Sequence, residues 1–132
     1  MEIKQRITLY MEACPNIAGR EIKRRITFGY IGFIITVLVT GYILLFDANL
    51  YIKGLIFFTS MSMAIPFFEV KSETCIVNAL LGLKNMGQEY QKEHEPAHLK
   101  IQRKTSISII IKSILISCCL TIFIFYVQTI TK

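Results

Sequence analysis

The chain contains two histidines, four residues apart in the segment His94-Glu95-Pro96-Ala97-His98. This segment fits the HExxH pattern, in which two histidines one helical turn apart bind zinc and the glutamate acts as a general base. Pro96 disfavours the helix interior that would bring both rings to one face, and no Asp, Glu or His follows position 98 to supply a third ligand. We therefore expect a solvated polar loop and no zinc hydrolase, with metal binding by His94 and His98 as the alternative.

Adjacent thiols occur at Cys118 and Cys119, inside a strongly apolar run. Such thiols suit a soft cation such as Hg(II), Cu(I) or Zn(II). Cysteine also packs as a small apolar residue, and neighbouring positions on a helix point about 100° apart. Packing is the favoured interpretation; the alternative is a metal or sulfur relay that also uses Cys14 or Cys75. A disulfide framework is not expected, since such frameworks are typical of small secreted domains.

Lys112 and Glu69 are the charged side chains expected at the boundary of apolar segments. A charge at this depth normally has a partner, so we predict a structural ion pair between them, with a role in transport as the alternative. The sequence contains no glycine-rich phosphate loop, no Gly-x-Ser-x-Gly elbow and no carboxylate pair within an apolar run. It therefore predicts neither autonomous catalysis nor a cofactor.

The composition is that of a membrane protein: 53% of the 132 residues are hydrophobic, 18% are charged and the mean hydropathy is +0.51. Residues 26–46, 50–68 and 109–130 form apolar stretches, each close to the length that a helix needs to cross about 30 Å of hydrocarbon. The prediction is an all-α integral membrane protein, one domain over residues 1–132, with three transmembrane helices in contact with lipid. The net charge of +6 lies at the ends of these stretches and not in a basic, aromatic surface, so no nucleic-acid partner is expected.

The distribution of basic residues predicts an orientation. If the chain crosses three times, one side of the membrane receives Arg20, Lys23, Arg24, Arg25, Lys71, Lys84, Lys100, Arg103 and Lys104. The other side receives Lys53 and Lys132. The positive-inside rule then puts the N-terminus in the cytoplasm and the C-terminus outside.

Three segments are expected on the cytoplasmic side. Residues 1–15 show the periodicity of an amphipathic helix, which predicts a helix lying on the inner leaflet. Residues 74–87 are apolar but too short to span, so we expect a short interfacial helix there. The polar residues 88–105 are the place where partner contacts are expected.

Small residues recur every four positions on two of the predicted spans, as Gly32, Thr36 and Thr40 on the first and as Ser113, Ser117 and Thr121 on the third. Such rows are typical of close helix packing in lipid, with a polar pore lined by the same hydroxyls as the alternative. The favoured hypothesis is a non-catalytic accessory or scaffold subunit of a membrane complex, or a homo-oligomer. The other hypothesis is a carrier of a soft metal ion or sulfur species through the membrane cysteines.

Residues 16–87 also show a family resemblance. Asn16, the Arg24-Arg25 pair, a glycine-containing span, then Cys75 and Leu80-Leu81-Gly82-Leu83 occur in an order that resembles the YgaP-like transmembrane domain family. The resemblance implies a small bacterial inner-membrane unit in which an Asn/Arg-rich start leads into a helical hairpin. Some members of that family carry a rhodanese sulfurtransferase domain. This sequence has Ile76 where the family prefers proline, and it adds a third span.

Overall fold

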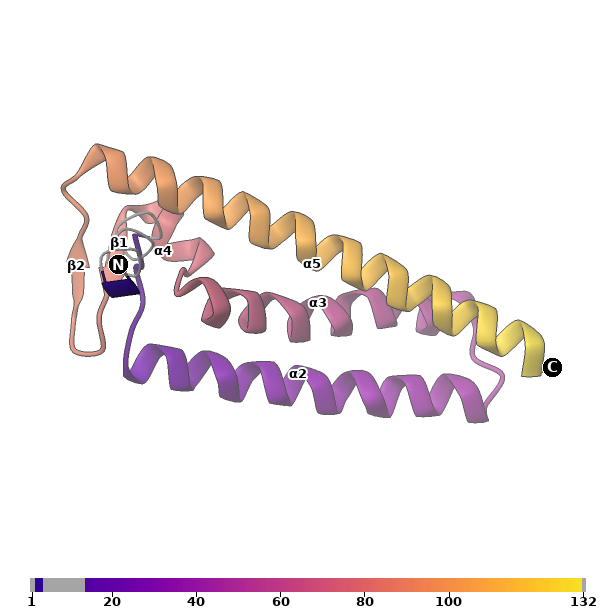
Figure 1. Ribbon diagram of the computed structural model, residues 1–132. Coiled ribbons are helices and arrows are strands. Elements are labelled where there is room, and N and C mark those ends of the chain that lie inside the picture. The colour runs from indigo at the N-terminus through magenta and orange to yellow at the C-terminus, as the bar shows by residue number, and fades with distance from the viewer. Residues whose placement is uncertain (1, 4–13, 132) are drawn as a thin grey trace.

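The computed structural model describes residues 2–3 and 14–131, so most of the helix predicted for residues 1–15 lies outside the described residues. The elements are α2 (Arg20–Leu45), α3 (Leu50–Ser72), α4 (Ile76–Leu81), β1 (Leu83–Asn85), β2 (Tyr90–Lys92) and α5 (Pro96–Thr131) (Figure 1). Helices α2, α3 and α5 are long and apolar enough to cross a membrane. The predicted fold class, a helical protein with three membrane spans, is confirmed.

Helices α2 and α3 form an antiparallel hairpin with a short connection. The N–H of Phe46 donates to the carbonyl oxygen of Tyr42 at the end of α2, and the Asn49 side chain caps α3 by accepting from the N–H of Ile52 at 3.0 Å. Pro66 lies inside α3, which is common in membrane helices because neighbouring groups replace the lost backbone bond.

Helix α3 is the middle helix of the bundle, packed against α2 on one side and α5 on the other (Figure 1). Helix α2 approaches the backbone of α3 closely at Gly32, where an added Cβ would lie 2.8 Å from backbone atoms of Ser62 and Met63. At the far end of the bundle, α2 and α5 also meet, through a buried apolar cluster of Ile43, Ala48, Ile56 and Ile124.

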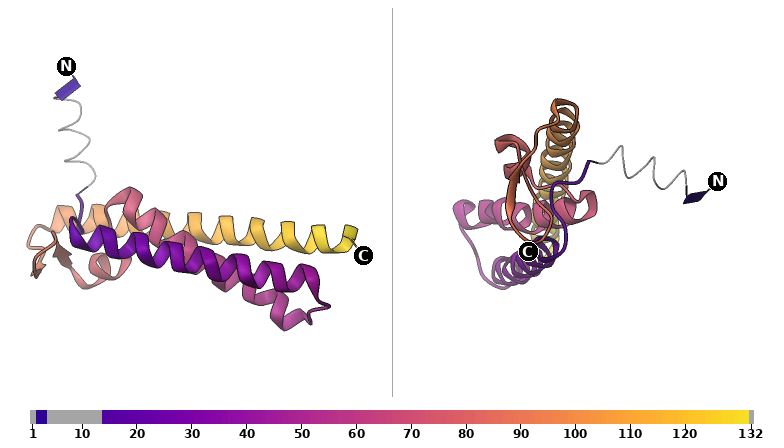
Figure 2. Two further views of the ribbon diagram at one scale, coloured as in Figure 1. Left: turned by 90° about the horizontal axis from the view of Figure 1, so that it is seen from below. Right: turned by 90° about the vertical axis from the view of Figure 1, so that its left-hand side faces the viewer.

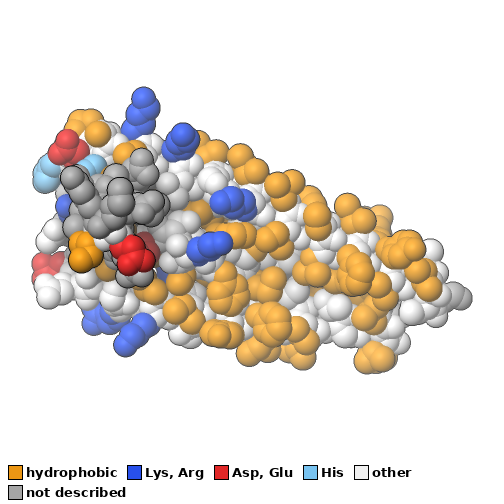
Figure 3. Space-filling model, viewed as in Figure 1, with side chains coloured by type: hydrophobic (Ala, Val, Ile, Leu, Met, Phe, Trp, Pro, Cys, Tyr) orange, Lys and Arg blue, Asp and Glu red, His pale blue; other side chains and the backbone are white. Residues whose placement is uncertain are grey.

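The surface of the bundle is the reverse of that of a soluble protein. Large apolar side chains such as Leu38, Phe58 and Phe123 are exposed, whereas Ser60 and Ser113 are fully buried. On the face shown in Figure 3, hydrophobic side chains cover the right-hand part of the molecule, and the visible Lys and Arg side chains lie on the left-hand part. A bundle with small polar residues inside and apolar side chains on its surface is suited to a surrounding of lipid.

At the charged end of the bundle, the structure of residues 74–92 differs from the prediction. The helix predicted over 74–87 is only α4, because Gly82 adopts a left-handed conformation (φ 68°) and ends it. An antiparallel hairpin follows, in which Leu83 of β1 pairs with Lys92 of β2. The left view of Figure 2 places this hairpin at the end of the molecule opposite the C-terminus.

The third long helix begins earlier than the predicted 109–130 span. It starts at Pro96, so the second half of the polar segment 88–105 is helical and continuous with the span. Proline fits the first turn of a helix, where no backbone N–H is needed for an intrahelical bond. Residues 96–105, the second half of the polar segment, therefore form the first turns of the same helix as the third predicted span.

Candidate functional site

An ion pair joins the two helices of the hairpin near their charged ends. Arg25 Nη1 of α2 lies 2.7 Å from Glu69 Oε2 of α3, and the Glu69 side chain is only 2% exposed. The second carboxylate oxygen, Oε1, accepts from the backbone N–H of Ile76 at 2.9 Å. Glu69 thus connects α2, α3 and the start of α4.

The thiol of Cys75 lies beside this ion pair. Arg25 Nη2 donates to Cys75 Sγ at 2.9 Å, and Cys75 has no exposed surface. Burial raises the pKa of the Cys75 thiol above its usual value, and the charge of Glu69 adds to this effect, although the Asn78 N–H and Arg25 partly oppose it. The thiol is therefore protonated at neutral pH, which is the state of an inert, structural cysteine.

The segment before α2 is bound to the same place by the side chain of Asn16. Asn16 Oδ1 accepts from the Cys75 N–H at 2.6 Å, and Asn16 Nδ2 donates to the Cys75 carbonyl oxygen at 3.1 Å. The backbone carbonyl of Asn16 in turn accepts from the N–H of Asn85 at 2.8 Å. We call Asn16, Arg25, Glu69 and Cys75 the polar junction, since together they connect the N-terminal segment, α2, α3, α4 and the hairpin.

A pocket of about 350 Å³ lies next to the polar junction. Its lining residues are Cys14, Pro15, Lys84, Met86, Glu93, His98 and Gln102. Gln102 has no exposed surface, and among the described residues neither its amide nitrogen nor its amide oxygen has a hydrogen-bond partner. The α5 wall of the pocket therefore contains a buried polar group.

Glu93 is the central charge of this pocket. Its carboxylate lies 3.8 Å from Lys84 Nζ and 3.6 Å from His98 Nδ1. Burial alone would raise the pKa of Glu93, but the Glu95 N–H, Lys84 and His98 together outweigh burial and lower it. Glu93 is thus ionised at neutral pH and partnered from two elements.

The structure does not assemble His94 and His98 into the geometry of an HExxH helix. His94 precedes α5, whereas His98 lies in its first turn next to Glu93. Within residues 2–3 and 14–131, no group of three or more His, Cys, Asp or Glu side chains is arranged to hold a metal ion.

The predicted ion pair between Lys112 and Glu69 is wrong. Glu69 pairs with Arg25, and Lys112 is exposed on α5. The sequence does not distinguish Arg25 as the partner, because this residue is one of several cations that flank the first span. The pairing joins residues 44 apart in the chain, which hydropathy patterns do not report.

The adjacent cysteines are far from the other two. Cys118 and Cys119 are exposed on the second half of α5, whereas Cys14 and Cys75 are buried at the charged end. At about 1.5 Å per residue, Cys118 lies roughly 24 Å along α5 from the pocket residue Gln102. A relay between the two sets of thiols would need a carrier site between them.

The small residues of the predicted rows lie at different depths. Gly32, Thr36, Ser113 and Ser117 are buried, and Thr121 is partly buried. The hydroxyls of Thr36 and Thr121 donate to carbonyl oxygens of their own helices, both at 2.7 Å.

Thr36 and Thr40 also lie along an apolar groove of about 310 Å³ between α2 and α5. We call this the α2–α5 groove, and it is lined by Phe33, Thr36, Val37, Thr40, Met63, Leu120, Phe123 and Ile124. Met63 of α3 forms part of it, so the groove lies on the middle helix, between its two neighbours.

Comparisons with known proteins return no match: no protein-family model, no curated protein and no solved structure is similar to this chain at a significant level.

Proposed function

We propose that this protein is a non-catalytic subunit of an assembly in the bacterial cytoplasmic membrane. In this proposal the three long helices anchor the chain, and the α2–α5 groove receives another transmembrane helix, from a second copy or from a different protein. The resemblance of residues 16–87 to YgaP-like hairpins is consistent with a small inner-membrane unit of this kind.

The observation that carries the proposal is the α2–α5 groove. Helix α3 packs along both neighbours, whereas α2 and α5 meet mainly at the outer end, where Gln128 Nε2 donates to the Ile43 carbonyl oxygen at 3.2 Å. The bundle therefore presents a lipid-facing groove with small residues, Thr36 and Thr40, on its α2 wall. Membrane helices associate through close packing at such small residues.

The polar junction supports a structural role in preference to a catalytic one. The Glu69 carboxylate is bound by Arg25 and Ile76, and the Asn16 amide is bound by the backbone of Cys75. These groups bind one another, and the buried Cys75 thiol lacks the exposure that a nucleophile needs. Their arrangement suits a rigid connection between the membrane helices and the charged end.

Two tryptophan substitutions test this proposal. Val37 lines the α2–α5 groove and is 52% exposed, whereas its neighbour Leu38 is 67% exposed and does not line the groove. Val37→Trp should fill the groove, while Leu38→Trp adds the same bulk to a position about 100° around the helix.

We expect the full-length protein, extracted in a mild detergent, to have a mass by light scattering above that of one 15.2 kDa chain with its detergent. We expect Val37→Trp to lower that mass at equal concentration and Leu38→Trp to leave it unchanged. A strictly monomeric wild-type protein that co-purifies with no other chain would overturn the proposal.

A further inference from the structure

A second polar concavity lies between the end of α3 and the first half of α5. It has a volume of about 460 Å³ and is lined by Ser72, Ile101, Lys104, Thr105, Ser108 and Lys112. We call it the α3–α5 cradle. We propose that the α3–α5 cradle binds the phosphate group of an anionic phospholipid of the inner leaflet.

The lining of the cradle has the chemistry of a phosphate site. Lys104, Ser108 and Lys112 recur every four residues on α5, so they lie along one face of the helix. Thr105 and Ser72 add two more hydroxyls, and none of the residues that line the cradle is a carboxylate. Two ammonium groups and three hydroxyl donors match the several acceptor oxygens and the negative charge of a phosphodiester.

Lys112 requires a counter-ion that the described part of the chain does not supply. It lies inside the apolar stretch 109–130 and is exposed, and among residues 2–3 and 14–131 the ion pairs include neither Lys112 nor Lys104. Lys53, the cation within the apolar stretch 50–68, lies over the Phe125 ring at 5.9 Å. A cation at this depth normally pairs with an anion, and a lipid phosphate at the headgroup level is within reach of a lysine that extends toward the interface.

The surroundings of the cradle favour a lipid over a free phosphate ion. Beyond Lys112 toward the membrane centre, α5 exposes Leu115 and Ile116, which can contact acyl chains. Away from the membrane, Lys104 also lines an adjoining groove with Lys100 and Arg103. The cradle therefore lies where a basic surface passes into an apolar one, as a headgroup with its chains requires.

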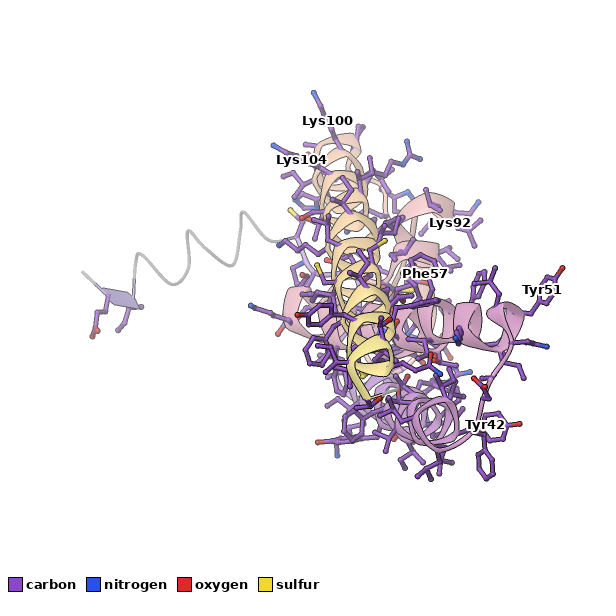
Figure 4. All side chains as sticks on the ribbon, turned by 90° about the vertical axis from the view of Figure 1, so that its right-hand side faces the viewer. Tyr42, Tyr51, Phe57, Lys92, Lys100 and Lys104 are labelled. Carbon is purple, nitrogen blue, oxygen red and sulfur yellow. The ribbon has the colours of Figure 1, made fainter. Side chains whose placement is uncertain are left out.

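Figure 4 shows how the lysines are distributed. Lys100 and Lys104 project from α5 at the outside of the bundle, whereas Lys92, on the hairpin, projects to another side. Lys92 is exposed and lines neither the cradle nor the adjoining groove. It offers a control in which one lysine charge is removed away from the proposed site.

The test is native mass spectrometry of the full-length protein released from detergent, titrated with phosphatidylglycerol and, separately, with phosphatidylcholine. Each lysine near an anionic headgroup contributes enough to change binding about fivefold. Lys104→Gln/Lys112→Gln should therefore weaken binding of phosphatidylglycerol by at least about tenfold, Lys92→Gln should not, and phosphatidylcholine binding should be the same in all three proteins. Lys104→Arg/Lys112→Arg, which keeps both charges, should bind phosphatidylglycerol as the wild type does.

Two further outcomes decide the source of the phosphate. Inorganic phosphate at millimolar concentration should not displace phosphatidylglycerol from the wild-type protein; displacement would assign the cradle to a free phosphate ion and overturn the lipid proposal. Equal binding of phosphatidylglycerol by the glutamine double variant and by Lys92→Gln would overturn any phosphate site at the cradle. If the double variant does not fold, the single Lys112→Gln variant should bind phosphatidylglycerol about fivefold more weakly than the wild type. Unchanged binding by that variant would overturn the proposal.

Discussion

Glu69 connects three helices at the charged end of the bundle. One of its carboxylate oxygens binds Arg25 on α2, and the other binds the Ile76 N–H at the start of α4. An ion pair this well buried contributes little compared with an apolar pair of the same shape, but loss of one partner leaves the other without compensation. The position should therefore tolerate substitution poorly.

Glu69→Gln should lower the free energy of unfolding by about 2 kcal/mol or more, because the amide keeps an acceptor for Ile76 but loses the charged bond to Arg25. The measurement is unfolding of the purified protein in mixed micelles of increasing SDS content. Glu73→Gln is the matched control, since this partly exposed side chain makes neither an ion pair nor a hydrogen bond with the residues that the structure describes. Equal losses in the two variants would contradict the role assigned to Glu69.

At the scale of the elements, the α2–α3 hairpin depends on the absence of a side chain at one position. A Cβ on Gly32 would meet backbone atoms of Ser62 and Met63 at 2.8 Å, and a backbone cannot move aside as a flexible side chain can. Gly41 lies on the same helix, and a Cβ added there would have open space around it, with no contact within 4 Å among the described residues. Comparing alanine substitutions at Gly32 and Gly41 therefore distinguishes the effect of helix packing from the effect of helix propensity.

Gly32→Ala should destabilise the bundle by about 1–3 kcal/mol, since α2 must move away from α3 to admit the methyl group. Gly41→Ala should be neutral or stabilising by up to about 1 kcal/mol, because alanine favours a helix and its methyl group has room there. Both values come from the same SDS titration. An undiminished stability of Gly32→Ala would mean that the helices do not approach as closely as described.

The sequence predicts the elements that lipid imposes and misses those that long-range contacts decide. Three spans follow from hydropathy, because a helix in hydrocarbon must satisfy its own backbone. The hairpin of β1 and β2 does not follow from the sequence, since its strands are only three residues each and β1 lies in a segment whose apolar character suggests a helix. The α2–α3 ion pair is also missed: periodicity identifies the charged ends of helices but not which charges meet.

At the scale of the whole molecule, most charged residues and most exposed apolar side chains lie at different positions along the bundle axis. Most basic residues of the described chain lie on the end that carries α4 and the hairpin, whereas the opposite end has Lys53 near the start of α3. On the face shown in Figure 3, that opposite end is covered by apolar side chains. Cations are retained on the cytoplasmic side during insertion, so this asymmetry favours an orientation with the hairpin in the cytoplasm and the end of α5 outside. The same orientation would bring the α3–α5 cradle to the anionic inner leaflet.

Two introduced cysteines test this orientation in spheroplasts treated with a membrane-impermeant maleimide. Thr131→Cys, at the exposed end of α5, should be labelled in intact spheroplasts. Gln91→Cys, exposed on β2, should be labelled only after lysis. The unsubstituted protein supplies the background, because Cys14 and Cys75 are buried and Cys118 and Cys119 lie within a membrane helix, where maleimide reacts poorly with thiols held away from water. Labelling of Gln91→Cys before lysis, with Thr131→Cys protected, would reverse the orientation and place the cradle at the outer leaflet.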